Sequence, residues 1–157
     1  MLTGARISPC GRYRYELTRT WGKGPVLSFV MLNPSTADAS VDDATIRRCL
    51  AFAKRDGFDG LRVVNLFAFR ATDPSVMAQA VDPVGPENDA YLLDLFVADR
   101  PAVVAAWGVG GGLHRRDVAV RQLAGMMGVD LLCLGTTQNG SPRHPLYVRA
   151  DQPLVAL

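Results

Sequence analysis

Short apolar runs alternate with segments of helical period along most of the chain. Four of these runs are rich in Val and Leu and are apolar at nearly every position, which is typical of strands covered on both faces. They are Val26–Leu32 (VLSFVML), Leu61–Phe67 (LRVVNLF), Ala102–Trp107 (AVVAAW) and Val129–Leu134 (VDLLCL). We predict that these runs form a mainly parallel sheet.

Three helices are predicted between these strands. Asp42 and Asp43 are placed to cap the first helix and Gly57 to end it, Pro86 lies in the first turn of the second, and the third spans Leu113–Met127. The apolar positions at helical spacing are Ile46, Cys49, Leu50 and Ala53 in the first helix, Leu92, Leu95 and Phe96 in the second, and Val118, Val120, Leu123 and Met127 in the third. Each helix therefore has one face suited to covering a sheet.

The segment before the first apolar run alternates polar and apolar residues. Tyr13–Trp21 meets Val26 through Gly22–Gly24, which predicts a β-hairpin at the sheet edge. The complete pattern predicts an α/β fold, a three-layer sandwich with a mainly parallel central sheet of about four strands plus an N-terminal β-hairpin. Because no repeat, low-complexity tract or linker interrupts it, we expect residues 1–157 to form one domain.

Composition narrows the class of protein. The 157 residues are 48% hydrophobic and 20% charged, as in ordinary globular domains. No apolar stretch reaches the roughly 20 residues that span a bilayer, and the N-terminal residues lack the apolar core of a signal peptide. Three widely spaced cysteines argue against a disulfide framework or a zinc site. We expect a cytoplasmic protein without a membrane partner. Its net charge of +2 permits a nucleic-acid partner without requiring one.

Polar residues, glycines and a histidine follow the ends of the predicted strands. Ligands bind outside the carboxyl ends of the strands in such sheets, so these segments predict one shared cleft. In chain order they are Asn33-Pro34-Ser35-Thr36, then Asn65 with Phe67 and Phe69, then Gly108 through Gly112, and finally Gly135 through Ser141 with Arg143-His144-Pro145.

Each of these segments also has a structural interpretation. Asn33 and its neighbours have the composition of a plain turn. The amide of Asn65, inside an apolar strand, needs partners for its donor and its acceptor, which a ligand or a structural hydrogen bond could supply. His144 could be an exposed loop residue.

The glycines after the third strand match neither a P-loop nor a dinucleotide-binding fingerprint. Gly110 and Gly111, with Gly112, form either a flexible turn or a set of backbone amides that could bind an anion, with Arg115 and Arg116 one turn further on.

Two charged clusters lie near Asn33 in the sequence. Asp38, Asp42 and Asp43 could cap a helix or supply oxygen ligands for Mg²⁺. Arg47 and Arg48 are expected on a solvated helix face, with contacts to phosphates as the alternative.

Five strings in this sequence resemble the family catalogued as domain of unknown function 1643: MLNPSTADASVDDATIRRC, VVNLFAFRATDP, GPENDAYL, AWG and HPLY. The order of the strand-end motifs also resembles, more distantly, the uracil-DNA glycosylase superfamily. In that superfamily a water-positioning loop, a base-reading Asn, a Trp-Gly pair and a His-Pro loop follow successive strands. The corresponding positions are Asn33-Pro34, Asn65, Trp107-Gly108 and His144-Pro145-Leu146.

This resemblance implies a hydrolase that flips out and excises a damaged or modified base, a DNA-repair activity without metal or organic cofactor. Asn33 would hold the water, His144 would donate to the departing base, and Asn65 would read the base edge. The residues implied for stacking are Phe67 or Phe69, those for the wedge are Leu146 or Tyr147, and those for the nucleic-acid backbone are Ser35, Gly110, Gly111, Arg115 and Arg116.

Departures from the superfamily pattern leave alternatives open. Met31 stands where a Gly is usual and could narrow or close the base pocket, and Ser35 replaces a Gly or Tyr. A non-catalytic module that binds a nucleotide or nucleic acid would keep the fold. A metal-assisted nucleoside or nucleotide hydrolase would instead use the aspartate cluster.

Overall fold

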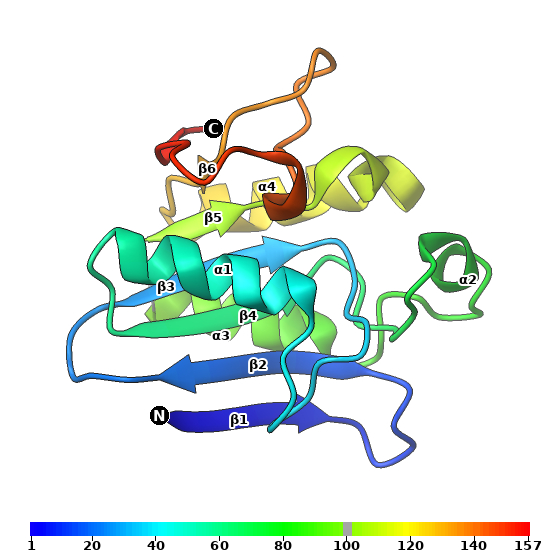
Figure 1. Cartoon of the computed structure of the whole chain (residues 1–157). Helices are drawn as coiled ribbons and strands as arrows, with labels where there is room; N and C mark the ends of the chain where they lie inside the picture. The colour runs from blue at the N-terminus through cyan, green and yellow to red at the C-terminus, as the bar shows by residue number, and fades with distance from the viewer. Residues whose placement is uncertain (99–101) are drawn as a thin grey trace.

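A seven-stranded sheet organises the computed structural model, which describes residues 1–98 and 102–157 (Figure 1). In sheet order the strands are β1 (Leu2–Ile7), β2 (Arg14–Thr20), β4 (Gly60–Asn65), β3 (Val26–Met31), β5 (Val103–Ala105), β6 (Leu132–Cys133) and β7 (Val155–Ala156). The helices are α1 (Ala44–Arg55), α2 (Pro74–Ala78), α3 (Asn88–Ala98) and α4 (Arg116–Met126), with 3₁₀ turns η1 (Gly108–Arg115) and η2 (Pro145–Tyr147).

The four central strands β4, β3, β5 and β6 are parallel to one another and lie within the four apolar runs, except for one residue at the start of β4, so the predicted parallel core is confirmed. Strand β3 lies between β4 and β5, which means that the chain leaves β3 first toward one side of the sheet and later toward the other. Such a reversal opens a crevice at the carboxyl ends of the strands.

The edges of the sheet differ from the prediction. We predicted about four strands and a hairpin between Tyr13–Trp21 and Val26, whereas β2 pairs antiparallel with β1 and β4, and the N-terminal hairpin is β1–β2. Strand β7, antiparallel to β6, was not predicted either. None of the residues of β1 is buried and β7 has two residues, so neither carries an apolar run that a sequence pattern could reveal.

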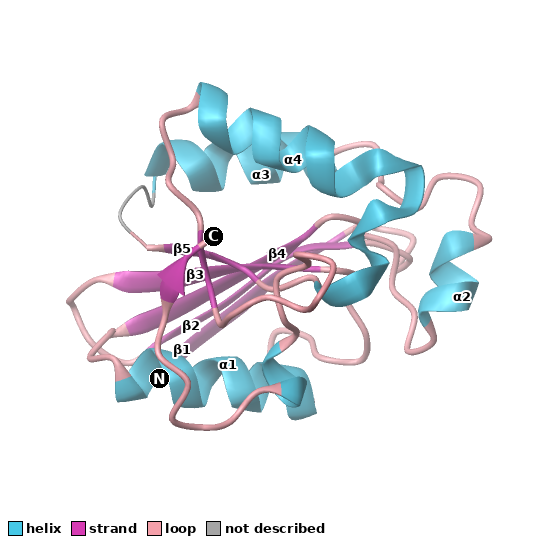
Figure 2. Cartoon of the chain, turned by 90° about the horizontal axis from the view of Figure 1, so that it is seen from above, coloured by secondary structure: helices cyan, strands magenta, loops and turns pink. Residues whose placement is uncertain are grey.

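Helices cover both faces of the sheet, giving three layers (Figure 2). On one face α1 packs against a cluster that includes Leu27, Phe29 and Val63. On the other, α3 and α4 pack against a cluster that includes Val30 and Val64. Neighbouring strand residues thus enter opposite clusters, as the two-residue period of a strand requires.

Helix α1 follows the prediction closely, because the Asp43 carboxylate accepts the Ile46 N–H at 2.9 Å and Gly57 follows the end with φ +80°. Helix α3 starts at Asn88 rather than at Pro86, and α2 was not predicted.

The third predicted helix is wrong at its start. His114 and Arg115 have φ of 52° and 53°, so the chain breaks there and α4 begins at Arg116. Within residues 1–98 and 102–157, none of the helices has the length and apolar character needed to cross a membrane.

Candidate functional site

A cavity of about 710 Å³ lies at the carboxyl ends of β3, β4 and β5, within the usual size range of ligand pockets. All four strand-end segments contribute to its lining, together with the start of α1. The buried strand residues Arg14, Met31, Val63 and Asn65 are called the floor of the cavity here. The surrounding walls come from residues 32–36, 43–46, 71–74, 107–110 and 137–147, of which the lining residues include Asn33, Ser35, Asp43, Thr72, Trp107, Gly108, Gly110, Arg143, His144, Leu146 and Tyr147.

Asn33 is held in place by its own amide. Its Nδ2 donates to the Pro34 carbonyl at 3.1 Å and to the Ala71 carbonyl at 2.8 Å, which ties the segment after β3 to the segment after β4. Both N–H groups are then used, and no other described residue donates to Oδ1. This oxygen is a fixed acceptor available to a molecule in the cavity.

Asn65 is the most unusual residue of the floor. It is fully buried at the end of β4, and neither Oδ1 nor Nδ2 has a hydrogen-bond partner among the described residues. Buried amides are nearly always paired, since leaving both groups unpaired is unfavourable by a few kcal/mol. The geometry leaves an adjacent donor and acceptor for a ligand.

His144 is half-buried and its tautomer is set by the backbone. Nδ1 accepts the Leu146 N–H at 3.1 Å, which assigns the imidazole proton to Nε2. Burial lowers the pKa of His144 below its ordinary 6.5, while the charge of Asp43 acts to raise it. At neutral pH the side chain is a neutral hydrogen-bond donor at the cavity wall.

We expect NMR titration to show His144 as the Nε2–H tautomer at neutral pH, with a midpoint below 6.5. Since the unfolded chain takes up this proton first, the free energy of unfolding should fall as the pH drops from 6.5 through the folded-state pKa. A His114→Gln variant assigns the resonances, because the chain has two histidines. A midpoint above 6.5, or an Nδ1–H tautomer, would contradict this geometry.

Arg14 was not predicted as a site residue, yet it forms part of the floor. It is 2% exposed, donates from Nη1 to the Ala37 carbonyl at 3.0 Å, and has no partner for Nε among the described residues. Burial lowers the pKa of Arg14 to about 10, so the guanidinium is still charged at neutral pH. It forms no ion pair with the described residues.

A β-bulge directs Arg14 into the cavity. Arg6 pairs with Glu16 and Ile7 pairs with Arg14, so Tyr15 is an extra residue in β2. The bulge places Arg14 on the α1 face with Leu17, whereas strict alternation would place it with Glu16 on the opposite face. This change of phase explains why the sequence pattern did not reveal it.

The aspartate cluster is divided between three roles. Asp43 caps α1 with one carboxylate oxygen and lines the cavity, while Asp42 pairs with buried Arg19. Asp38 accepts the Ser40 and Val41 N–H groups in its own loop and does not line the cavity. No group of three or more potential metal ligands occurs in the described part of the chain.

The aromatic lining is not the one predicted. Phe67 is fully buried in the core on the α3 face, and Phe69 packs edge-on against Tyr13 with ring centroids 5.8 Å apart. Neither lines the cavity, because the chain turns out of β4 after Asn65, so the structure does not bring these two predicted stacking residues to the site. Trp107 lines the cavity instead.

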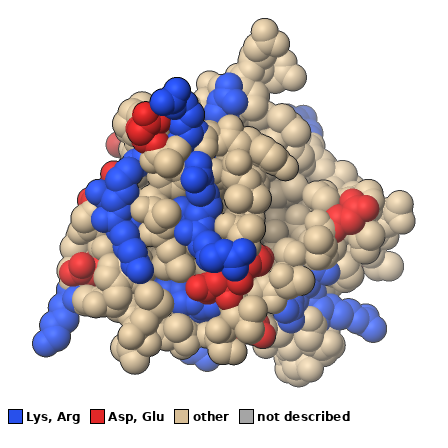
Figure 3. Space-filling view, viewed as in Figure 1, with Lys and Arg blue, Asp and Glu red and all other residues tan. Residues whose placement is uncertain are grey.

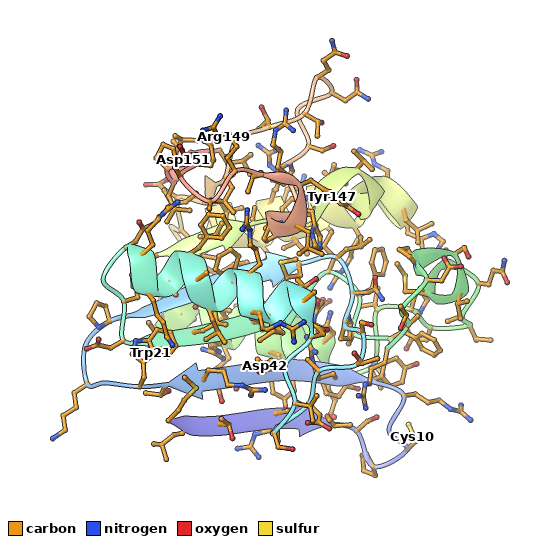
Figure 4. The ribbon with its side chains drawn as sticks, viewed as in Figure 1. Cys10, Trp21, Asp42, Tyr147, Arg149 and Asp151 are labelled. Carbon is orange, nitrogen blue, oxygen red and sulfur yellow. The ribbon has the colours of Figure 1, made fainter. Side chains whose placement is uncertain are left out.

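The two wedge candidates, Leu146 and Tyr147, lie at the cavity rim and are exposed by 42% and 78%. Figure 4 shows Tyr147 on η2, close to α1. Arg48 holds this segment to α1 by donating to the carbonyls of Pro145 and Val148, so it is not a free surface cation.

Only part of the glycine-rich segment lies at the cavity. Gly110 lines the cavity, but Gly111 is buried outside it, where a Cβ would lie 2.4 Å from Trp107 Cδ1. Arg116 donates from Nε to the Leu66 carbonyl at 2.8 Å and from Nη2 to the Asp89 carboxylate. Both contacts are within the protein, so this side chain has a structural role. Arg115 is exposed and does not line the cavity. Of these four predicted backbone-contact residues, the structure therefore brings only Gly110 to the cavity.

The surface around the cavity carries several cations. Figure 3 shows Lys and Arg side chains on the face that α1 covers. Arg143 lines the cavity and is exposed, and Arg47 lies on the exposed side of α1.

A family model described as a protein of unknown function, DUF1643, matches residues 14–146, which include every residue of the cavity lining except Tyr147. No curated protein and no solved structure matches the chain.

Proposed function

This chain belongs to the DUF1643 family of proteins of unknown function, and we propose that it is a glycosylase-like hydrolase that excises a flipped-out base from nucleic acid. The observation that carries the proposal is Asn65. Its unpaired donor and acceptor lie on the floor of a cavity that Asn33 and His144 also line. An adjacent donor and acceptor match the hydrogen-bonding edge of a nucleobase.

The size of the cavity supports the proposal. Met31 contributes to the floor, yet the cavity measures about 710 Å³, so Met31 does not close it. That volume suffices for a base with its sugar. The exposed rim residues Leu146 and Tyr147 are suited to occupy the gap that the base leaves in the stack.

Hydrolysis needs a positioned water and a path for its proton. Asn33 Oδ1 is the fixed acceptor that would hold the water. Because an amide is a poor base, we assign the proton to Asp43, whose second carboxylate oxygen has no partner among the described residues. The water oxygen bonds to the sugar C1′, and the C1′–N electron pair leaves with the base.

His144 would stabilise the departing base. Its Nε2–H can donate a hydrogen bond as negative charge develops there, and the neutral imidazole keeps that proton at pH 7. The base anion later takes a proton from solvent and Asp43 returns its proton to solvent, which completes the hydrolysis to free base and abasic site and restores the carboxylate.

We expect base release from at least one oligonucleotide in a panel containing uracil, hypoxanthine, xanthine, oxidised pyrimidines or hypermodified bases, in single and double strands. Alkaline cleavage at abasic sites measures it. Asn33→Ala and His144→Ala should each lower the rate by about 100-fold. Asp151→Asn, at an exposed site outside the cavity lining, is the matched control and should leave the rate unchanged.

The protein must come from a host without its own uracil glycosylase. Release should persist in EDTA, since no step uses a metal, whereas loss in EDTA would favour the metal-assisted hydrolase. An absence of release from every oligonucleotide would refute the glycosylase and favour a module that binds a nucleotide without turnover.

A further inference from the structure

Two buried polar groups of the cavity floor lack the partners that burial normally requires. Arg14 has an unpaired Nε and no counter-ion, and Asn65 has both polar atoms unpaired, among the described residues. An arginine side chain offers only donors, so its ligand must offer acceptors. Asn65 requires a donor beside an acceptor.

The charge of Arg14 is only partly compensated by its surroundings. Asp43 is the carboxylate that acts on it, at a distance too long for an ion pair, while Arg70 and Arg19 add positive charge. Arg19 is itself paired with Asp42. His144 is neutral on the cavity wall. A cation buried in this way strongly favours an anion beside it, because little solvent screens the two charges.

We propose that Arg14 and Asn65 bind the excised base as its anion, so that Arg14 is a catalytic residue that stabilises the leaving group. This inference rests on the proposed function. When the C1′–N bond breaks, both electrons go to the ring nitrogen, and the negative charge spreads onto the carbonyl oxygens of the ring. Arg14 N–H groups donate to these acceptors, and Asn65 pairs with a neighbouring N–H and C=O.

An inorganic phosphate would also be attracted to Arg14. Inorganic phosphate at neutral pH offers acceptor oxygens and one or two O–H donors, but it directs them tetrahedrally, whereas the donor and the acceptor of the Asn65 amide lie side by side in one plane. An ionised ring that keeps one N–H and its carbonyl groups satisfies both residues. The two floor residues together therefore favour a base anion over a phosphate.

Calorimetric titration with free bases tests this without requiring turnover. 5-Nitrouracil, ionised at neutral pH, is compared with uracil, and xanthine with the less acidic hypoxanthine. We expect the wild-type protein to bind the acidic member of at least one pair about 10- to 100-fold more tightly than its partner, since hydrogen bonds to charged groups are the stronger ones. Phosphate should bind more weakly than that member.

Arg14→Gln should remove this preference and Arg14→Lys should retain most of it, while Arg149→Gln, at an exposed position, should leave it unchanged. The thermal midpoint of each variant reports folding. Equal binding within both pairs, no binding of any base, or a preference that survives in Arg14→Gln would overturn the proposal. Binding of phosphate in preference to every base would do the same.

A kinetic measurement separates this proposal from the proposed function. Arg14→Gln should slow release of uracil from an oligonucleotide about 10- to 100-fold more than release of 5-nitrouracil. The 5-nitrouracil anion is the more stable leaving group, so its departure depends less on stabilisation by the guanidinium. A merely structural role would slow both equally and would refute the catalytic assignment. If the wild-type protein releases no base but still prefers the anionic free base, the glycosylase fails and the anion site stands.

Discussion

Replacing Asn65 with leucine is expected to stabilise the fold and abolish function together. The amide has no partner for either polar atom among the described residues and is fully buried, so its removal should raise the free energy of unfolding by about 1–2 kcal/mol. A flipped base would then leave a donor and an acceptor unpaired in the cavity. At about 2 kcal/mol for each group, base release should fall about 1000-fold.

Asn88→Leu is the matched control, because Asn88 is equally buried but its Nδ2 donates to the carbonyls of Asn65 and Leu66 at 2.9 and 3.1 Å. Its loss should lower the free energy of unfolding by about 1–3 kcal/mol. Urea unfolding followed by circular dichroism gives both values. If both variants lose stability, Asn65 has a structural partner and is not a ligand-binding residue.

Arg19→Met is expected to have the largest effect on stability. Arg19 is 1% exposed and pairs with Asp42 at 2.9 Å, and its guanidinium also binds carbonyl groups of β1, β2 and the segment before α1. Figure 4 shows Asp42 between β2 and α1. Since these carbonyls and the carboxylate would lose their donor, the free energy of unfolding should fall by about 3–5 kcal/mol in urea titrations.

Arg14→Met, on the same face of β2, is expected to affect stability differently from Arg19→Met. Arg14 is buried to the same degree but has one side-chain hydrogen bond and no ion pair among the described residues. Removing this charge should leave the free energy of unfolding unchanged or raise it. Equal losses in the Arg14 and Arg19 variants would show that Arg14 is a structural residue, contrary to its assignment to the ligand.

The central strands and α1 were predictable because they carry strong local signals. A strand buried on both faces is a short apolar run, and α1 combines a helical apolar period with Asp43 as its cap. The break at His114 and Arg115 has no such signal. Both adopt a left-handed conformation that glycine would be expected to occupy, and tertiary packing overrides that local preference.

The place of the site was predictable for a topological reason. Asn65 ends a strand and Asn33, Trp107 and His144 each come after one, and the ends of parallel strands meet at one edge whatever the details of packing. Which side chains face the cavity was less predictable. Alternation extended past Asn65 places Phe67 on the same face, but β4 ends at Asn65 and Phe67 enters the opposite core.

Local patterns along the chain therefore specify the parallel core, the main helices and the edge at which a ligand would bind, since periodicity and strand ends need no long-range information. Pairing of β2 with β4, the bulge at Tyr15 and the burial of Arg14 depend on contacts between residues far apart in sequence. Those contacts distinguish two similar arginines on one strand. Arg19 forms an ion pair with a carboxylate and stabilises the fold. Arg14 forms no ion pair with the described residues, so its charge is available to a ligand in the cavity.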